Sequence, residues 1–212
     1  MPQFITPFQK DALVEVVNIS ASKAATALAH LVGDNRVVIQ VPEVFVDVAE
    51  KVPAFIGDEN NVHTAILLAL SGSAPGVLLF TFPSSSALQV AGLLSAGHRK
   101  ELPVLDETDR AALRVMGDTL VGTMIDTLSQ FLTLEMSKSP ADIATDMLGS
   151  IVDAIVVDMS ARSSVILTFR VRFTIEVKDK ETVSGQMFFM FEPKATDTIL
   201  SSLRNKFPHS SV

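Results

Sequence analysis

The chain has 212 residues, of which 48% are hydrophobic and 19% are charged, a composition typical of a globular protein. This length is sufficient for one domain, or two closely packed halves, with a sizeable core. The formal net charge is −7, there is no Trp or Tyr, and the basic residues form no cluster, which argues against binding to nucleic acid. The absence of cysteine excludes disulfides and thiolate-based zinc or redox chemistry, and it fits the reducing cytoplasm in which we expect the protein to act.

Membrane insertion is not expected from the hydropathy of the chain. Residues 1–7 lack the basic flank and apolar stretch of a secretion signal. The most apolar window covers residues 64–82, but the segment SGSAPG at 71–76 interrupts it with residues that favour a turn. Because the apolar run on each side is shorter than a bilayer crossing requires, we predict a buried hairpin and no membrane span.

The first half of the chain begins with a long helix. Thr6 is a candidate N-cap, Pro7 occupies the first helical position, and Gly33 lies just past the predicted end. The following residues predict, in order, β structure over 36–49 with a turn near Pro42, a short helix over 49–56, a polar loop over 57–61, strands over 62–70 and 76–82, and a helix over 84–95.

The second half of the chain repeats this order of elements. A long helix is predicted over 107–131, and Pro140 stands in the place of Pro42. The remaining elements are predicted as a helical stretch from Pro140 to about residue 153, strands over 163–177 and 183–191, and a helix over 193–203. The clearest sequence echo is between GVLLFTFP, from Gly76, and GQMFFMFEP, from Gly185.

This duplication predicts the architecture. We expect one domain over 1–212 that consists of two internal repeats, about 7–97 and 105–205. Neither repeat can bury the face of its own sheet. The expected fold is therefore α+β, with a pseudo-twofold relating the halves, one antiparallel sheet shared between them, and the two long helices packed on that sheet.

A stripe of polar residues runs along the first helix. Asp11, Glu15 and Asn18 are spaced i, i+4 and i+7, so their side chains stack on one side, and the small residues Ser22 and Ala25 extend the same line. Asn is a mediocre helix former, costing roughly several tenths of a kcal/mol relative to Ala, so its place in mid-helix suggests a function. The alternative is a solvated helix face, on which Glu and Asn are common. Apolar residues on the other sides of the helix, at positions 13, 17, 19 and 28, can face the core.

The surroundings of the stripe resemble the CheC family. The similar features are the order D-x3-E-x2-N on a first long helix, a proline a little over twenty residues later in VIQVPEV, and the small-residue run ISASKAATAL. The duplication and the segment DMLG at 146–149 are also similar to that family, and the resemblance extends over about 9–203.

The resemblance implies a chemotaxis phosphatase that hydrolyses the aspartyl phosphate of the response regulator CheY. In that role Asn18 orients the attacking water, Glu15 pairs with the phosphate-contacting lysine of the regulator, and Asp11 supports the stripe. An amide suits this task because it can hold a water without adding negative charge beside the phosphoryl oxygens. The implied phosphatase has no cofactor of its own, since the Mg²⁺ belongs to the regulator.

The second long helix departs from the family pattern of two sites. Aligning EVVNIS from Glu15 with VMGDTL from Val115 places Ala111, Val115 and Asp118 opposite Asp11, Glu15 and Asn18. A valine cannot pair with a lysine, and a carboxylate would repel the phosphoryl oxygens. We therefore predict one working site and a degenerate second site.

Other residue types give weaker signals. The histidines at 30, 63, 98 and 209 have no paired spacing that would bind a metal, and no G-x-S-x-G or G-K-[ST] motif is present. A second hypothesis belongs to a different class. CheC relatives also bind the receptor deamidase CheD, so the chain could be a binding module that sequesters CheD without catalysis. The retained Glu15 and Asn18 favour turnover, because docking alone does not require an amide that orients water.

Overall fold

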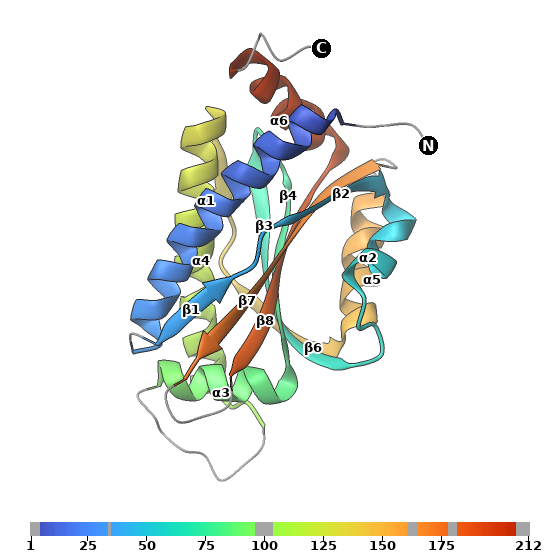
Figure 1. The fold of residues 1–212 in the computed structure, drawn as a ribbon. Coiled ribbons are helices and arrows are strands. Elements are labelled where there is room, and N and C mark those ends of the chain that lie inside the picture. Colours follow the sequence, from blue (N-terminus) through green and yellow to red (C-terminus); the bar gives the residue numbers. More distant parts are fainter. Residues whose placement is uncertain (1–4, 34, 96–103, 161–164, 178–181, 207–212) are drawn as a thin grey trace.

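The computed structural model describes residues 5–33, 35–95, 104–160, 165–177 and 182–206 (Figure 1). Its elements in chain order are α1 (Pro7–Leu31), β1 (Arg36–Ile39), β2 (Glu43–Val48), the 3₁₀ turn η1 (Ala49–Lys51), α2 (Val52–Ile56), β3 (Val62–Gly72), β4 (Gly76–Pro83), α3 (Ser84–Leu94), α4 (Glu107–Leu132), β5 (Met136–Lys138), β6 (Asp142–Met147), α5 (Leu148–Ser160), β7 (Val165–Glu176), β8 (Val183–Phe191) and α6 (Pro193–Lys206).

The eight strands form one antiparallel sheet in the order β1-β7-β8-β4-β3-β5. Strand β2 continues along β7 beside β1, and β6 continues along β3 beside β5. The edge strands are thus exchanged: β1 and β2 of the first half pair with β7 of the second half, and β5 and β6 of the second half pair with β3 of the first. This arrangement confirms the expected α+β fold, with a pseudo-twofold axis between β4 and β8.

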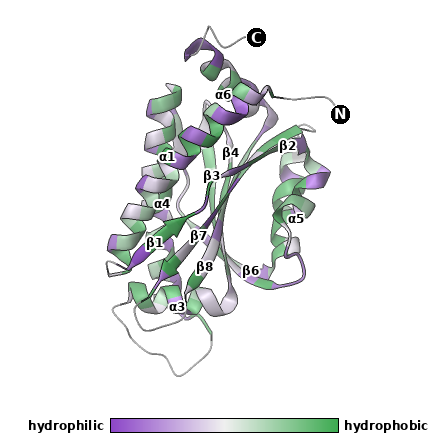
Figure 2. Cartoon of the chain, viewed as in Figure 1, coloured by the Kyte–Doolittle hydropathy of each residue, from purple (hydrophilic) through white to green (hydrophobic). Residues whose placement is uncertain are grey.

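Helices cover both faces of the sheet (Figure 1). Helices α1, α3, α4 and α6 contribute to a large core on one face, and α2 and α5 enclose a smaller core on the other. Successive residues of β3 alternate between the two, since Ile66 and Leu68 join the large core whereas Ala65 and Leu67 join the small one. Strands buried on both faces read as nearly continuous hydrophobic runs, and Figure 2 shows hydrophobic residues along the central strands.

Helix α1 begins where the sequence predicts. The Thr6 hydroxyl accepts a hydrogen bond from the Gln9 amide at 3.2 Å, and the Gln9 side chain accepts one from the Thr6 amide at 2.9 Å, forming a capping box. Among the described helices, α1 is long and apolar enough to cross a bilayer by length and composition. In this fold it is a core helix that packs on α4 and β1, and this packing accounts for its hydropathy.

One prediction for the second half is wrong. The residues after Pro140 were expected to be helical to about residue 153, but they form strand β6, and α5 extends over Leu148–Ser160. Strand β6 is polar and mostly exposed, because it is an edge strand held to β3 by backbone hydrogen bonds. Its sequence therefore lacks the alternation of apolar and polar residues by which half-buried strands are recognised.

Candidate functional site

The polar stripe on α1 faces outward. Asp11 and Glu15 are exposed and Asn18 is half-buried, whereas Leu13, Val17 and the other core residues of α1 lie on the opposite side. None of the three polar side chains makes a hydrogen bond or ion pair with another described residue. A carboxylate and an amide one helical turn apart are therefore held on a packed helix with their polar atoms available to a partner.

One expectation for α1 is incorrect. Ile19 was expected to face the core, but 38% of it is exposed. It lies four residues after Glu15 and next to Asn18, so it adds an apolar surface to the edge of the stripe. The sequence pattern alone did not reveal this exposed apolar side chain beside the polar pair. Apolar residues are spread around so much of this helix that the pattern does not separate a buried face from an exposed one.

Helix α4 has the same pattern of burial as α1 but carries different side chains at the exposed positions. Residues 111–120 have the same order of buried, half-buried and exposed positions as residues 11–20. At the positions that correspond to Asp11, Glu15 and Asn18, however, α4 carries Ala111, Val115 and Asp118. The side chain of Val115 is 60% exposed and offers no polar atom.

Asp118 is engaged in an ion pair within the chain. Its Oδ1 accepts a hydrogen bond from Lys138 Nζ of β5, and the two side chains are 40% and 24% exposed, respectively. Lys138 could not be recognised from the sequence, because this contact depends on the pairing of β5 with β3, which brings the strand beside α4. The face of α4 thus carries a paired carboxylate where the face of α1 carries an unpaired amide.

The histidines do not form a metal site in the part of the chain that the structure covers. His63 is 2% exposed, and its Nε2 lies 2.7 Å from Asp58 Oδ2, while His30 is exposed. His98 and His209 lie outside the described residues. A hydrogen bond from Asn61, together with His63, lowers the pKa of Asp58. Among described residues, no group of three His, Asp or Glu side chains could hold a metal ion.

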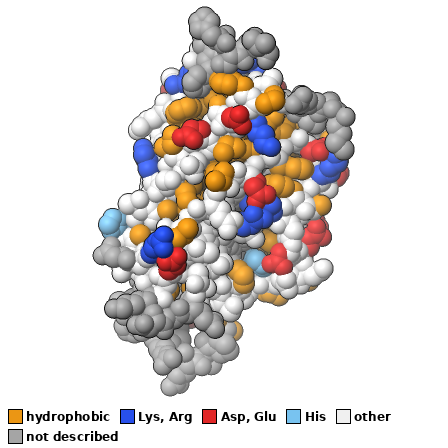
Figure 3. Space-filling model, viewed as in Figure 1, with side chains coloured by type: hydrophobic (Ala, Val, Ile, Leu, Met, Phe, Trp, Pro, Cys, Tyr) orange, Lys and Arg blue, Asp and Glu red, His pale blue; other side chains and the backbone are white. Residues whose placement is uncertain are grey.

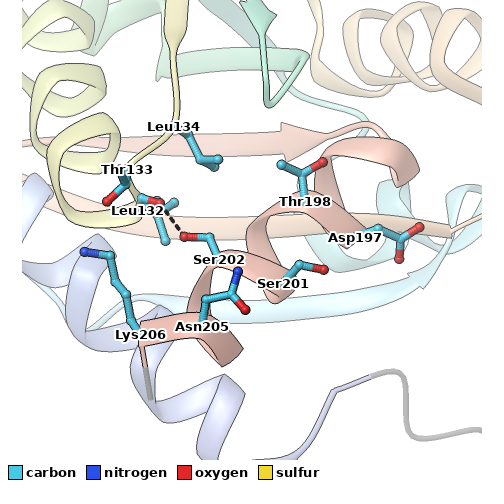
Figure 4. A pocket seen from close by; sticks show the side chains of 9 residues that line it. All are labelled: Leu132, Thr133, Leu134, Asp197, Thr198, Ser201, Ser202, Asn205 and Lys206. Atoms are coloured by element: carbon cyan, nitrogen blue, oxygen red, sulfur yellow. Dashed lines mark hydrogen bonds between the residues drawn. The ribbon is translucent and has the colours of Figure 1, made fainter. Parts of the chain in front are cut away.

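An open depression of about 680 Å³ lies between the end of α4 and helix α6 (Figure 4), and Asp11, Glu15 and Asn18 are not among its lining residues. Four of its nine lining residues carry hydroxyls and one, Asn205, carries an amide, and Ser202 Oγ donates to the Leu132 carbonyl. Its one cationic lining residue among those described, Lys206, lies over the Phe131 ring at 5.4 Å. On the described surface in Figure 3, Lys and Arg side chains are interspersed with acidic ones, so this face offers no basic patch for nucleic acid.

Comparison with known proteins relates the sequence to a chemotaxis family. The sequence profile of the CheC-like family matches residues 8–46, which contain the stripe on α1, all of strand β1 and most of strand β2. Over this segment the chain is similar to the CheC-like family. It is 25% identical to the CheY-P phosphatase CheC of Bacillus subtilis (strain 168) over 154 residues, covering 72% of this chain and 73% of that protein. The resemblance seen in the sequence is confirmed.

Solved structures support the fold of this CheC relative. FliY of Thermotoga maritima matches with a TM-score of 0.71 at 18% identity, covering 96% of this chain and 100% of that one. A chain of the complex of CheX with CheY, BeF3 and Mg²⁺ from Borrelia burgdorferi matches with a TM-score of 0.55 at 14% identity, covering 84% and 99%. At these identities the likeness establishes the shared α+β fold.

Proposed function

We propose that this chain is a CheY-P phosphatase that accelerates hydrolysis of the aspartyl phosphate on the response regulator CheY at a single site on α1. The observation that carries the proposal is the outward-facing pair of Glu15 and Asn18, which has no partner among the described residues. The relation to the CheC-like family and the 25% identity with a CheY-P phosphatase support it. The existence of a CheX–CheY complex for a protein of the same fold supports the regulator as the partner.

Asn18 is the proposed positioning group for water. An acyl phosphate is already labile, so the contribution required from the phosphatase is a water held in line with phosphorus. The Asn18 carbonyl oxygen can accept one proton of that water, and the neutral amide adds no charge that would repel the phosphoryl oxygens. Asn18 is half-buried on a packed helix, which fixes its backbone and so lowers the entropic cost of orienting the water.

Glu15 is the proposed anchor for the regulator. It is exposed one turn before Asn18, so a lysine that contacts the phosphate on the regulator can pair with it while the phosphate approaches Asn18. Asp11 lies one further turn away and adds a second negative charge to the same line. The exposed Ile19 would contact the regulator beside this polar line.

The corresponding face of α4 is proposed to be inactive. Val115 cannot pair with a lysine, and Asp118 is held by Lys138, whose positive charge would repel the same lysine of a regulator. We propose that the chain works in the cytoplasm without a cofactor of its own, and that the Mg²⁺ needed for phosphoryl chemistry is held by the regulator.

The proposal is tested by the decay of radiolabelled CheY-P mixed with the purified chain. We expect acceleration by the wild type and its loss in Asn18→Ala and in Glu15→Ala. A chain that co-elutes with CheD but leaves the decay of CheY-P unchanged would contradict the phosphatase and support a binding module for CheD instead.

A further inference from the structure

A groove of about 620 Å³ lies on the face of the sheet opposite α1, between α5 and strands β3 and β6. Its floor is apolar, with Leu67, Ile151 and Ile155 among its lining residues. The acidic residues Asp142, Asp146 and Asp158 also line it, and no Lys, Arg or His is among the described residues that do so.

The pseudo-twofold relates this groove to the region between α2 and strands β7 and β2, which is filled. Asp142 of β6 is paired in register with Leu67 of β3, and Glu43 of β2 is paired in the same way with Arg170 of β7. The two strand pairs are exchanged by the pseudo-twofold, so Asp142 corresponds to Glu43 and Leu67 corresponds to Arg170. The acidic residue is present in both halves, whereas the arginine is present in one.

In the filled half, four side chains occupy the space, those of Glu43, Phe45, Phe55 and Arg170. Arg170 donates to the Glu43 carboxylate at 3.1 and 2.5 Å and to the Phe55 carbonyl oxygen at 2.7 Å. Its guanidinium lies 4.5 Å from the centre of the Phe55 ring, which stacks on the Phe45 ring at 4.7 Å. The carboxylate, the guanidinium and the aromatic rings therefore form one compact cluster.

The groove exists because small residues replace those of the filled half. The shift of 99 residues from Glu43 to Asp142 takes Phe45 to Ala144 and Phe55 to Ala154, and both alanines line the groove. The volume of two phenyl rings and the length of an arginine are thus missing, while the carboxylate that would hold the arginine remains. Among the described residues, Asp142 Oδ1 accepts a hydrogen bond only from the Ile143 amide, at 2.8 Å, and Asp142 makes no ion pair.

We propose that this groove binds a segment of a partner protein that presents an arginine beside an aromatic side chain. The arginine of the partner pairs with Asp142, as Arg170 pairs with Glu43, and the aromatic ring fills the space beside Ala144 and Ala154. Asp146, which also lines the groove, adds negative charge that favours a basic segment. This inference is independent of the proposed phosphatase, since the groove and the stripe on α1 lie on opposite faces of the sheet.

The experiment uses N-acetyl-Phe-Arg-amide as the probe and N-acetyl-Phe-Gln-amide as its uncharged match, each titrated into the full chain and followed by NMR. For a fragment of this size we expect a dissociation constant on the order of 1 mM, with shifts concentrated at the Ala144 and Ala154 methyl groups. The Phe-Gln probe should bind at least about tenfold more weakly. Equal binding of the two probes, or no shift at these methyl groups, would overturn the proposal.

Two variants separate the groove from the rest of the chain. Asp142→Asn keeps the shape and should weaken the Phe-Arg probe about tenfold without changing the fold. The variant Leu67→Arg/Ala154→Phe introduces the arginine and one of the two rings of the filled half and should abolish binding of the probe. The other possible occupant of the groove is a second copy of the chain, which analytical ultracentrifugation tests. If the wild type self-associates and this variant does not, the groove is an interface between two copies, and the proposal is overturned.

Discussion

The proposed difference between α1 and α4 predicts that a second site can be built. The variant Ala111→Asp/Val115→Glu/Asp118→Asn copies the stripe of α1 onto a helix face with the same pattern of exposure. Lys138 must be replaced as well, because its partner is lost and its charge would face the lysine of the regulator. The residue that corresponds to Lys138 in the first half is Ile39, so Lys138→Ile completes the copy. In an Asn18→Ala background, we expect these four substitutions to restore acceleration of CheY-P decay.

The structure allows both stability and rate to be estimated. The ion pair that is removed has partly exposed partners, so its loss should cost no more than about 1 kcal/mol of the free energy of unfolding. Taking roughly 6 Å as the separation of two like charges on neighbouring side chains, a retained Lys138 would repel the lysine of a docked regulator. At an effective dielectric constant of about 20 this repulsion is about 3 kcal/mol, which corresponds to a loss of more than about 100-fold. The version that retains Lys138 is therefore the matched control and should remain inactive.

The assay is the decay of radiolabelled CheY-P at equal concentrations of each variant, with circular dichroism and a melting curve as checks of folding. Activity of the rebuilt chain near that of the wild type, and none in the control with Lys138, would support the proposed roles. In the wild-type background the same substitutions should about double the rate per chain. A folded rebuilt chain that is no more active than Asn18→Ala alone would refute the assignment of catalysis to these residue types.

Two further predictions concern stability. Gly72 has φ +93°, and an added Cβ would lie 2.4 Å from a backbone oxygen. Gly72→Ala should therefore lower the free energy of unfolding, measured by urea titration, by about 2 kcal/mol. The control is Gly92→Ala, at an open helical position, which should be neutral or stabilising in the same titration. Hydrogen bonds from Arg170, and the charges of Arg170 and Arg172, lower the pKa of Glu43, so this carboxylate stabilises the fold above its ordinary pKa of about 4.3 and loses that effect as the pH falls through the lowered value. After allowance for solvent screening, Glu43→Gln should lower the free energy of unfolding at pH 7 by about 1–2 kcal/mol. Between pH 5 and pH 3 the variant should lose less stability than the wild type. Equal losses in the two proteins, measured by urea titrations at several pH values, would contradict this role.

Local sequence signals predicted most of the fold. Thr6 and Pro7 defined the start of α1, and the echo between the segments that begin at Gly76 and Gly185 revealed the duplication. Strand β6 was missed because an edge strand is held by its backbone, and most of its side chains are exposed in the folded chain. The periodicity of apolar residues indicates which side chains are buried, so it does not predict a strand whose side chains are mostly exposed.

The candidate site was predictable to the extent that it lies within one helix. The stacking of Glu15 and Asn18 follows from helical geometry alone, and the structure places both on the outer side of α1. The contact of Lys138 with Asp118 depends on strand pairing between distant parts of the chain, which no local pattern encodes. The groove beside Ala154 is likewise visible only when the two halves are compared in space.

The most direct test of the proposed function compares two substitutions at corresponding positions of α1 and α4. Asn18→Ala and Asp118→Ala remove side chains at corresponding half-buried positions, and the rate of CheY-P decay is measured for each. We expect Asn18→Ala to lose the acceleration, by about 100-fold or more, and Asp118→Ala to retain it. Full activity in Asn18→Ala together with loss in Asp118→Ala would place the reaction on the other helix and contradict the proposal.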